Sequence, residues 1–412
     1  MQTGSDERMD ENVLLQISYL VGNKETLLQM KKLSPRRPFD KYTCEFLSTL
    51  SKRIMTYGNI RKYPDLMTFA FWIRRASLNQ MKSEHGQREG IYRIGRGVSF
   101  HIAPSNVPIN FAYSMVAAIL TGNAAIVRVP SKNHEQIMVI VDALTRLLEC
   151  YQELKPYVCL IRYERNKEIN DLLSSFSDVR IIWGGDETIH EIRQSPLMPR
   201  ATEITFADRY SLAVIDADYY LEYNDAKKTA IDFYNDTYLN DQNACTSPIL
   251  VAWTGRDREQ AKEIFWGELH ELVREKYTFQ DIQGVNKLTS SYLAAANLSE
   301  NNRITVIRKK DNLLVRVILS EVDENLVKYK DNSGYFYEYD FDDILELRDL
   351  CNNQRCQTIG YIGNESMLLP LIMSGTKGID RIVPVGHTMD FELMWDGYDL
   401  FERLTRIIVL RK

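Results

Sequence analysis

The stretch that decides the fold is residues 97–132, which read GVSFHIAPSNVPINFAYSMVAAILTGNAAIVRVPSK. Its first apolar run, 98–102, has the length of a short strand, and a turn at 103–108 follows it. A continuous apolar stretch then predicts a buried helix that ends near Leu120, and 125–129 predicts a second strand. This order of strand, turn, helix and strand is typical of a parallel sheet that helices cover on both faces.

The same pattern continues along the chain. Residues 130–133 open a helix that we expect to run to about Leu148. The run 178–183 predicts a further strand, which a glycine pair ends before Asp186 begins the next helix. Parallel sheets of this kind bind ligands at the carboxyl ends of their strands, so the turns after these strands are the expected binding segments.

The segments before and after this region are predicted from the pattern of their apolar and aromatic residues. After residue 240 the pattern is less regular, with an aromatic run at 335–339 and a closing strand predicted at 406–410. Residues 12–82 predict mostly helix, because apolar residues recur near helical spacing. The first of these residues are Leu14, Leu15, Ile17, Leu20 and Val21.

Length and composition narrow the classes of protein. A chain of 412 residues favours two domains rather than one core. Its 51 lysines and arginines against 56 aspartates and glutamates give a net charge of −5, which argues against a nucleic-acid partner. Apolar residues make up 44% and charged residues 26%, so a mainly disordered chain is excluded.

The sequence also predicts a cellular compartment. The longest strongly apolar run, 111–120, is too short for a membrane span, which needs about 20 residues. Residues 1–11 are polar and acidic, without the basic start or the apolar stretch of a signal peptide. The 6 cysteines are too few for a disulfide scaffold. We therefore expect a cytoplasmic protein with free thiols.

Cys245 is the strongest candidate for a nucleophile. It lies in the small, polar segment 240–248, directly before the apolar run 249–253. A thiol in such a turn is accessible and can be approached by backbone amides, and a thiolate nucleophile needs both features. The alternative is a small apolar side chain packed in a turn. We expect burial for the other cysteines, which are Cys44, Cys150, Cys159, Cys351 and Cys356.

Asn106 and the histidines complete the polar candidates. Asn106 follows a predicted strand, and its neutral amide suits an oxyanion because it donates a hydrogen bond without transferring a proton. Its alternative role is an Asx-type turn cap. His101 has apolar neighbours in a strand, which favours a hydrogen-bonded core histidine. Neither the histidines nor the Cys351 and Cys356 pair shows metal-ligand spacing, so we expect no metal site.

Two turns offer places for a phosphate. Gly184 and Gly185 separate a strand from a helix and let a phosphate approach the helix end, although such pairs are often turn chemistry alone. Arg128 and Lys132 bracket another strand–helix turn, where the alternative is a solvated pair. The Gly-x-Gly-x-x-Gly fingerprint of dinucleotide binding is absent.

Taken in order, these segments resemble the aldehyde dehydrogenase superfamily and, within it, the LuxC-type acyl-CoA reductases. The resemblance runs from about residue 90 to the end of the chain. The matching segments are 97–108 for the oxyanion asparagine, 122–131 for the cofactor stretch, 183–189 for the turn over the cofactor pyrophosphate, 242–245 for the nucleophile, and 381–386 with 395–400 for a carboxyl-terminal signature of the reductases.

The resemblance implies an aldehyde dehydrogenase-like α/β fold, with a Rossmann-like parallel-sheet cofactor domain and a second α/β catalytic domain. The implied divisions are a helical region at 1–90 that packs on the cofactor domain, the cofactor domain at 91–240, the catalytic domain at 241–385, and a segment at 386–412 that supplies an oligomerisation strand. The implied cofactor-binding residues are Ala103, Pro104, Ser105, Arg128, Ser131, Lys132, Gly184, Gly185 and Thr188.

The implied activity is the reduction of an activated acyl group to an aldehyde. The donor would be an acyl-CoA or an acyl-protein thioester, with a fatty acyl group, and Cys245 would carry the acyl group while Asn106 stabilises the oxyanion. Hydrolytic members of the superfamily have a glutamate base where this chain places Thr205. Threonine is not a general base near neutral pH, so a thioester would survive to meet a hydride.

The cofactor and partners follow from the same resemblance. The superfamily's Lys-Pro-Ser-Glu becomes Arg128 to Lys132 with one additional residue, and a cation in place of the acid favours a 2′-phosphate, so NADPH is expected. An acyl-protein synthetase partner and a homo-oligomer are implied. The alternatives are a cysteine acyltransferase, an acyl-carrying subunit without hydride chemistry, and a non-catalytic relative used for assembly.

Overall fold

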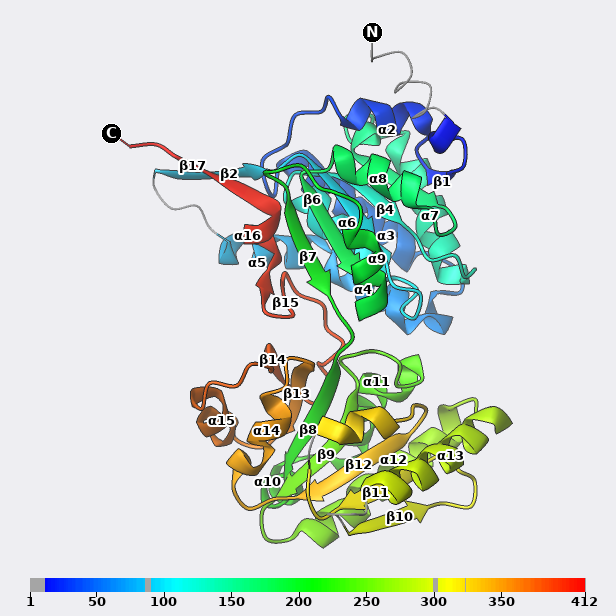
Figure 1. The fold of residues 1–412 in the computed structure, drawn as a ribbon, viewed down its shortest axis with the longest axis vertical. Coiled ribbons are helices and arrows are strands. Elements are labelled where there is room, and N and C mark those ends of the chain that lie inside the picture. Colours follow the sequence, from blue (N-terminus) through cyan, green and yellow to red (C-terminus); the bar gives the residue numbers. More distant parts are fainter. Residues whose placement is uncertain (1–11, 86–89, 299–302, 323, 412) are drawn as a thin grey trace. The chain divides into compact units, whose positions relative to one another are not determined.

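A computed structural model describes residues 12–85, 90–298, 303–322 and 324–411. The chain divides into two compact units, each with its own sheet (Figure 1). The first unit extends to Ala207 and resumes at Phe391, and the second covers Asp208–Asp390.

The first unit is built on a six-stranded sheet in the order β1-β5-β4-β3-β6-β7. Neighbouring strands are parallel, except that β1 is antiparallel to β5. The chain adds β4 and β5 on one side of β3, and β6 and β7 on the other, so the order reverses at β3. Doubly wound sheets bind ligands at such a reversal. The strands are β1 Ser18–Val21, β3 Val98–Ile102, β4 Ala124–Arg128, β5 Val158–Arg162, β6 Val179–Trp183 and β7 Thr202–Phe206.

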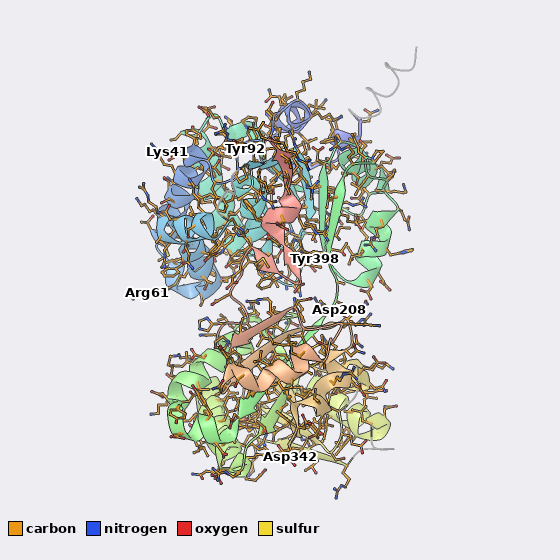
Figure 2. The ribbon with its side chains drawn as sticks, turned by 90° about the vertical axis from the view of Figure 1, so that its left-hand side faces the viewer. Lys41, Arg61, Tyr92, Asp208, Asp342 and Tyr398 are labelled. Carbon is orange, nitrogen blue, oxygen red and sulfur yellow. The ribbon has the colours of Figure 1, made fainter. Side chains whose placement is uncertain are left out.

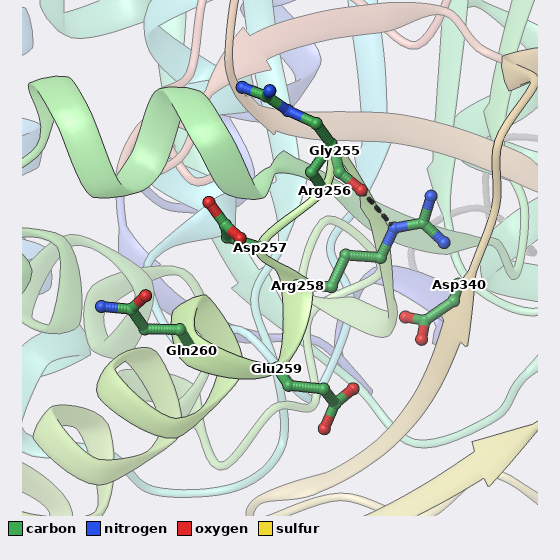
Figure 3. Close-up of a pocket in the computed structure, with 7 residues that line it drawn as sticks. All are labelled: Gly255, Arg256, Asp257, Arg258, Glu259, Gln260 and Asp340. Carbon is green, nitrogen blue, oxygen red and sulfur yellow. Dashed lines mark hydrogen bonds between the residues drawn. The ribbon is translucent and has the colours of Figure 1, made fainter.

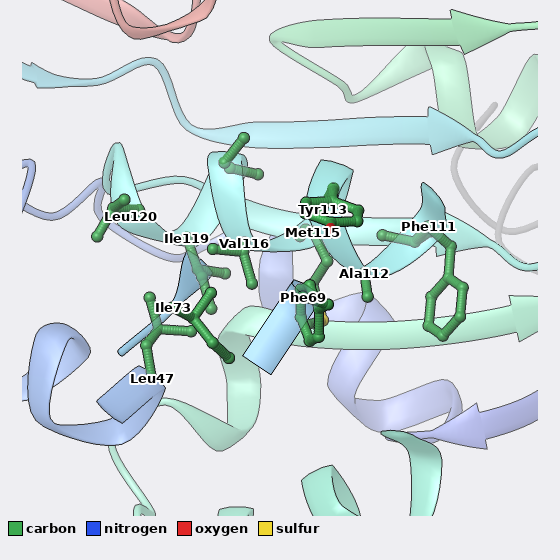
Figure 4. Packing of buried hydrophobic residues seen from close by; sticks show 14 of the residues in the cluster. Leu47, Phe69, Ile73, Phe111, Ala112, Tyr113, Met115, Val116, Ile119 and Leu120 are labelled. Carbon is green, nitrogen blue, oxygen red and sulfur yellow. The ribbon is translucent and has the colours of Figure 1, made fainter. Parts of the chain in front are cut away.

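Helices cover both faces of this sheet. One core contains side chains of α3, α4, α6 and α7, and the other contains side chains of α2, α8 and α9. Residues 111–120 of α6 are all buried, and the helix packs beside Leu47 of α3 and Phe69 of α4 (Figure 4). The helices of this unit are α2 Lys24–Met30, α3 Lys41–Met55, α4 Pro64–Trp72, α5 Arg75–Glu84, α6 Asn110–Leu120, α7 Glu135–Leu148, α8 Lys167–Ser175, α9 Asp186–Arg193 and α16 Leu400–Leu404.

The second unit has a seven-stranded sheet in the order β10-β11-β12-β9-β8-β13-β14, parallel except for β10. Two buried clusters lie against it. Its strands are β8 Tyr210–Asp216, β9 Pro248–Thr254, β10 Ile304–Arg308, β11 Val315–Leu319, β12 Tyr335–Asp340, β13 Cys356–Ile362 and β14 Arg381–Pro384. Its helices are α10 Ala217–Tyr223, α11 Ala226–Asp236, α12 Arg258–Lys276, α13 Asp281–Leu298, α14 Arg348–Cys351 and α15 Leu369–Met373.

Two small antiparallel pairs complete the first unit. β15 (Met394–Trp395) pairs with β16 (Tyr398–Asp399). β2 (Ile91–Gly95) pairs with β17 (Thr405–Val409) in a two-stranded ribbon. This ribbon exposes apolar side chains, with Tyr92 47% and Val409 59% exposed (Figure 2 labels Tyr92). In the described ranges, no helix has the length and apolar character needed to cross a bilayer.

The predicted strands 98–102, 125–129 and 178–183 and the buried helix ending at Leu120 are confirmed, each to within one residue at its ends. The helical prediction for residues 12–82 is wrong at 18–21. These residues form β1, which pairs with β5 and places Ser18 opposite Arg162. A short apolar run fits either period, and here a distant strand edge supplied the backbone partners.

The division between the units differs from the expected boundary at 240/241. β8 pairs with both β9 and β13, so the residues that precede Cys245 share its sheet and the division falls after Ala207. The boundary near the end of the chain also falls later than the expected residue 386. Residues up to Asp390 stay with the second unit, and the chain then returns to the first, where β17 meets β2.

The side chains of His101 and the cysteines test two further expectations. His101 is fully buried, with Nδ1 2.7 Å from Ser114 Oγ and Nε2 2.8 Å from Ser99 Oγ. Burial lowers its pKa to about 3, so it is a neutral core histidine, as predicted. Cys159, Cys351 and Cys356 are buried as expected. The burial predicted for the other two is wrong, because Cys150 is exposed in the turn after α7 and Cys44 is half-buried.

Candidate active site

Cys245 lies in the turn that enters β9, and its side chain is partly exposed. Its backbone is tied to two strands of the second sheet. Ser211 Oγ on β8 donates to Cys245 O at 2.7 Å, and Thr358 N on β13 donates to the same Oγ at 3.2 Å. The thiol therefore belongs to a turn whose backbone is bonded to the sheet, just before a buried strand, and it is not enclosed in the core.

Gln242 fastens the same turn to β12. Its side chain is 2% exposed, and Nε2 donates to Pro248 O at 2.9 Å and to Tyr335 O at 3.0 Å. Its Oε1 accepts from Gly334 N at 2.9 Å and from Tyr335 N at 3.2 Å. The backbone of Gln242 itself has a φ of 58°, so the turn adopts a left-handed conformation that these bonds stabilise. No local sequence pattern signals this role of Gln242, because its partners Gly334 and Tyr335 are distant in the chain.

Replacing Gln242 by leucine is expected to lower the free energy of unfolding by about 3 kcal/mol or more. The change removes four hydrogen bonds of about 1 kcal/mol each and leaves buried backbone groups unpaired. Urea unfolding measures the loss, and Gln260→Leu, at an exposed position in α12, is the matched control with an expected change within about 0.5 kcal/mol. An unfolding midpoint equal to that of the unsubstituted protein would contradict this role for Gln242.

Asn106 lies at the carboxyl edge of the first sheet, in the turn between β3 and α6, and is exposed. Ala103, Pro104 and Ser105 precede it in the same turn. Ala103 N donates to Arg128 O at 3.1 Å, so this turn is bonded to the end of β4. This turn, with Asn106 exposed in it, therefore lies at the sheet edge where doubly wound sheets bind ligands.

The turn after β4 carries the predicted cations. Arg128 is not a solvated side chain. Its guanidinium carbon lies 4.5 Å from the centre of the Tyr163 ring, and Nη2 donates to Tyr163 O at 3.2 Å. Ser131 and Lys132 are both exposed in the turn before α7. Lys132 is therefore the more accessible of the two predicted cations.

The turn after β6 has features for and against a phosphate. Gly185 is exposed, and a Cβ placed on it would meet no atom within 4 Å, so there is open space beside it. Gly184 N already donates to Phe206 O at 3.1 Å, and Gly184 packs against half-buried Thr188. The first turn of α9 carries Asp186 and Glu187, which oppose an anion at this helix end.

The sheet order brings the predicted cofactor residues to one edge. β4, β3 and β6 are neighbours and parallel, so the turns that follow them lie side by side. The open space at Gly185 and the exposed Lys132 fit a nucleotide there. Cys245 belongs to the second unit. Among the residues that the structure describes, no group of histidine, cysteine or acidic side chains is arranged to hold a metal ion.

A separate pocket of about 620 Å³ lies at the other end of β9 (Figure 3). Cys245 precedes Pro248, the first residue of β9, whereas the pocket begins at Gly255, after its last residue. Arg256 and Arg258 at this pocket are paired with Asp218 and Asp342. The pocket is therefore distinct from the turn that carries the thiol.

The fold and the cysteine turn define a two-unit α/β chain of the aldehyde dehydrogenase type. A mutant of the 1-pyrroline-5-carboxylate dehydrogenase of Thermus thermophilus is similar in structure, with a TM-score of 0.61 and 12% identity over 100% of this chain and 97% of that one. Lactaldehyde dehydrogenase from Escherichia coli has a TM-score of 0.60 and 15% identity over 94% and 89% of the two chains. At these identities the likeness shows the fold, and it confirms the predicted fold class.

The family model for acyl-CoA reductase (LuxC) matches residues 73–407, so this chain belongs to that family, as its motifs predicted. The long-chain acyl-protein thioester reductase of Aliivibrio fischeri is 26% identical over 303 residues, which are 72% of this chain and 60% of that protein. The long-chain acyl-protein thioester reductase 2 of Photobacterium leiognathi is 22% identical over 323 residues, 76% and 64% of the two chains. This chain thus spans less than two thirds of the length of these relatives.

Proposed function

We propose that this chain reduces an activated acyl group to an aldehyde with NADPH, through a thioester on Cys245. The observation that carries the proposal is the partly exposed Cys245 thiol, which Ser211 and Gln242 hold at the start of β9 in a chain of the acyl-CoA reductase family. The similar reductases of Aliivibrio fischeri and Photobacterium leiognathi are named for acyl-protein thioesters, and the family for acyl-CoA, so both thioesters are the donor classes to test.

The first half of the reaction uses the sulfur. The Cys245 thiolate attacks the carbonyl carbon of the donor thioester and forms a carbon–sulfur bond, which moves an electron pair onto the carbonyl oxygen. When the oxyanion collapses, the bond to the donor sulfur breaks, and the leaving thiolate takes a proton from solvent. The acyl group is then a thioester of Cys245. Asn106 and the Cys245 backbone amide are the proposed hydrogen-bond donors to the oxyanion.

In the second half of the reaction, the thioester on Cys245 accepts a hydride, so it has to survive without being hydrolysed by water. Bound NADPH would supply a hydride to the carbonyl carbon of the acyl group. Thr205 is half-buried in β7. The family resemblance aligns it with the carboxylate base of the hydrolytic relatives, and a threonine hydroxyl does not activate water near neutral pH. The acyl group leaves as an aldehyde, and the bonding pair returns to the Cys245 sulfur.

The proposed cofactor residues are those at the carboxyl edge of the first sheet. The exposed Lys132 supports NADPH over NADH, because a cation beside the ribose attracts a 2′-phosphate.

For the assembly, we propose a homo-oligomer that uses the exposed ribbon of β2 and β17, and an acyl-protein synthetase that delivers the acyl group. The free thiols suit a reducing cytoplasm.

Intact-mass measurement tests the proposed function directly. The protein is incubated with acyl-CoA thioesters of short, medium and long chains, and NADPH is then added. We expect a mass increase equal to one acyl group, a preference for one chain-length class, and return to the starting mass with release of aldehyde after NADPH. An acyl adduct that NADPH leaves in place would indicate an acyl-carrying subunit or an acyltransferase instead. A protein that forms no adduct with any thioester would contradict the proposal.

A further inference from the structure

We propose that Arg162 is a specificity-determining residue that binds the 2′-phosphate of NADPH. This inference rests on the proposed function and adds a residue that the sequence motifs do not include. Arg162 is the last residue of β5, and β5 is the neighbour of β4 in the first sheet. Its side chain therefore begins at the same carboxyl edge as the turn that carries Lys132.

The guanidinium of Arg162 is only partly satisfied. Its Nη1 donates to Asn133 Oδ1 at 2.7 Å, in the turn between β4 and α7. Its Nε and Nη2 atoms are buried and have no hydrogen-bond partner. Buried donors without an acceptor are costly, and more so on a cation. An anion that reached them would remove this cost.

The two unsatisfied atoms also have the geometry of a phosphate site. Nε and Nη2 form one edge of the planar guanidinium fork, and that edge accepts two oxygens of one phosphate side by side. The third nitrogen, Nη1, holds the fork to Asn133. Ser131, Lys132 and Asn133 are all exposed, so the turn to which Arg162 is bonded lies at the surface of the first unit.

His134 lies near the positive charges of Lys132 and Arg162. Its Nε2 is also buried without a partner. Burial lowers the pKa of His134, and the nearby charges of Lys132 and Arg162 lower it further, while Asp65 acts in the opposite direction. Asp65 accepts hydrogen bonds from Leu66 N and Gln136 Nε2. Lys132, His134 and Arg162 thus lie near one another, and no contact described for Arg162 is with a carboxylate.

The position in the fold indicates which phosphate would bind. β3, α6 and β4 form the first strand–helix–strand unit, and folds of this kind read the ribose 2′ position at the end of the second strand. Arg128 occupies that end but is bonded to Tyr163. Arg162, at the end of the next strand, has two buried donor atoms, Nε and Nη2, without an acceptor. A ribose 2′-hydroxyl offers a single uncharged oxygen, so it pairs with these two donors less well than a phosphate does.

Nucleotide binding without an acyl donor tests this inference. NADPH and NADH are titrated into the full-length protein and their nicotinamide fluorescence is followed, with 2′,5′-ADP and 5′-AMP as competitors. We expect NADPH to bind about tenfold or more tightly than NADH. Arg162→Gln should weaken NADPH by about 10- to 100-fold, the effect of losing a hydrogen bond to a charged group, and leave NADH within about twofold. 2′,5′-ADP should compete with NADPH better than 5′-AMP in the unsubstituted protein only.

Arg165→Gln is the matched control, because Arg165 follows β5 closely but is 78% exposed. It should leave both affinities unchanged. An Arg162→Gln variant that binds NADPH as before, or that loses NADPH and NADH equally, would overturn the inference and leave the proposed function standing. Failure of the unsubstituted protein to bind either nucleotide would overturn both. If thermal unfolding shows that Arg162→Gln does not fold, Arg162→Lys keeps the charge without the fork and should lose part of the NADPH preference.

Discussion

Replacing Cys245 by alanine is expected to abolish both the acyl adduct and aldehyde formation, with a fall in turnover of about 10⁴-fold or more. The sulfur is the atom that bonds to the acyl carbon, and removal of a covalent nucleophile leaves only binding and oxyanion stabilisation. Little stability should be lost, within about 1 kcal/mol, because the thiol is partly exposed and its backbone partner Ser211 is untouched. Intact mass and NADPH oxidation measure the two effects together.

The control for this variant is Cys150→Ala. Cys150 is exposed in the turn after α7, in the first unit, and should keep full turnover and the acyl adduct. Retained reduction in Cys245→Ala would remove the nucleophile assignment, and transfer of the label to another cysteine would locate the true one. Loss of turnover in both variants would show that the thiol chemistry is nonspecific.

Replacing Asn106 by alanine is expected to slow formation of the acyl enzyme by about 10²- to 10³-fold. Removal of one donor to an oxyanion has effects of this size, because a pre-oriented amide acts only when charge develops on the carbonyl oxygen. Affinity for NADPH should stay within about twofold, since the loss concerns the transition state. Single-turnover acylation, followed by mass, separates this step from the hydride step.

The alternative role of Asn106, an Asx-type cap of the turn after β3, predicts a different result. Loss of a cap would lower the unfolding temperature and leave the acylation rate unchanged. Asn59→Ala is the matched control in the same unit, because Asn59 is exposed and makes no side-chain cap bond at its helix. It should change neither quantity. An Asn106→Ala variant that melts earlier but acylates at the normal rate would assign Asn106 to the turn alone.

The local sequence pattern was sufficient to predict the helices and strands nearest the candidate site. The run 111–120 is apolar on every side, and a helix of that kind can only be buried, as α6 is. The strands β3, β4 and β6 each end at a turn with glycine, proline or asparagine, so their ends were predictable. The small polar residues around Cys245 predicted a turn before a strand, and the structure has that turn and β9.

Distant contacts decided what local pattern could not. Residues 18–21 had near-helical spacing, but an antiparallel pairing with β5 made them a strand. The unit boundary moved from 240/241 to 207/208 because β8 is inserted between β9 and β13. Neither pairing has a signature in the residues themselves, since a short apolar strand fits many partners equally well.

By itself, the amino-acid sequence determined that this is a two-part α/β chain with a thiol in a polar turn and cations after a strand, because spacing, turn residues and residue chemistry are local properties. Only the tertiary structure decided what those groups can do. It packed Arg128 on the Tyr163 ring, left Arg162 with unsatisfied donors, and bonded Gln242 to Gly334. Hydrogen-bond satisfaction and burial depend on residues far away in the chain, and they exist only after the sheets have formed.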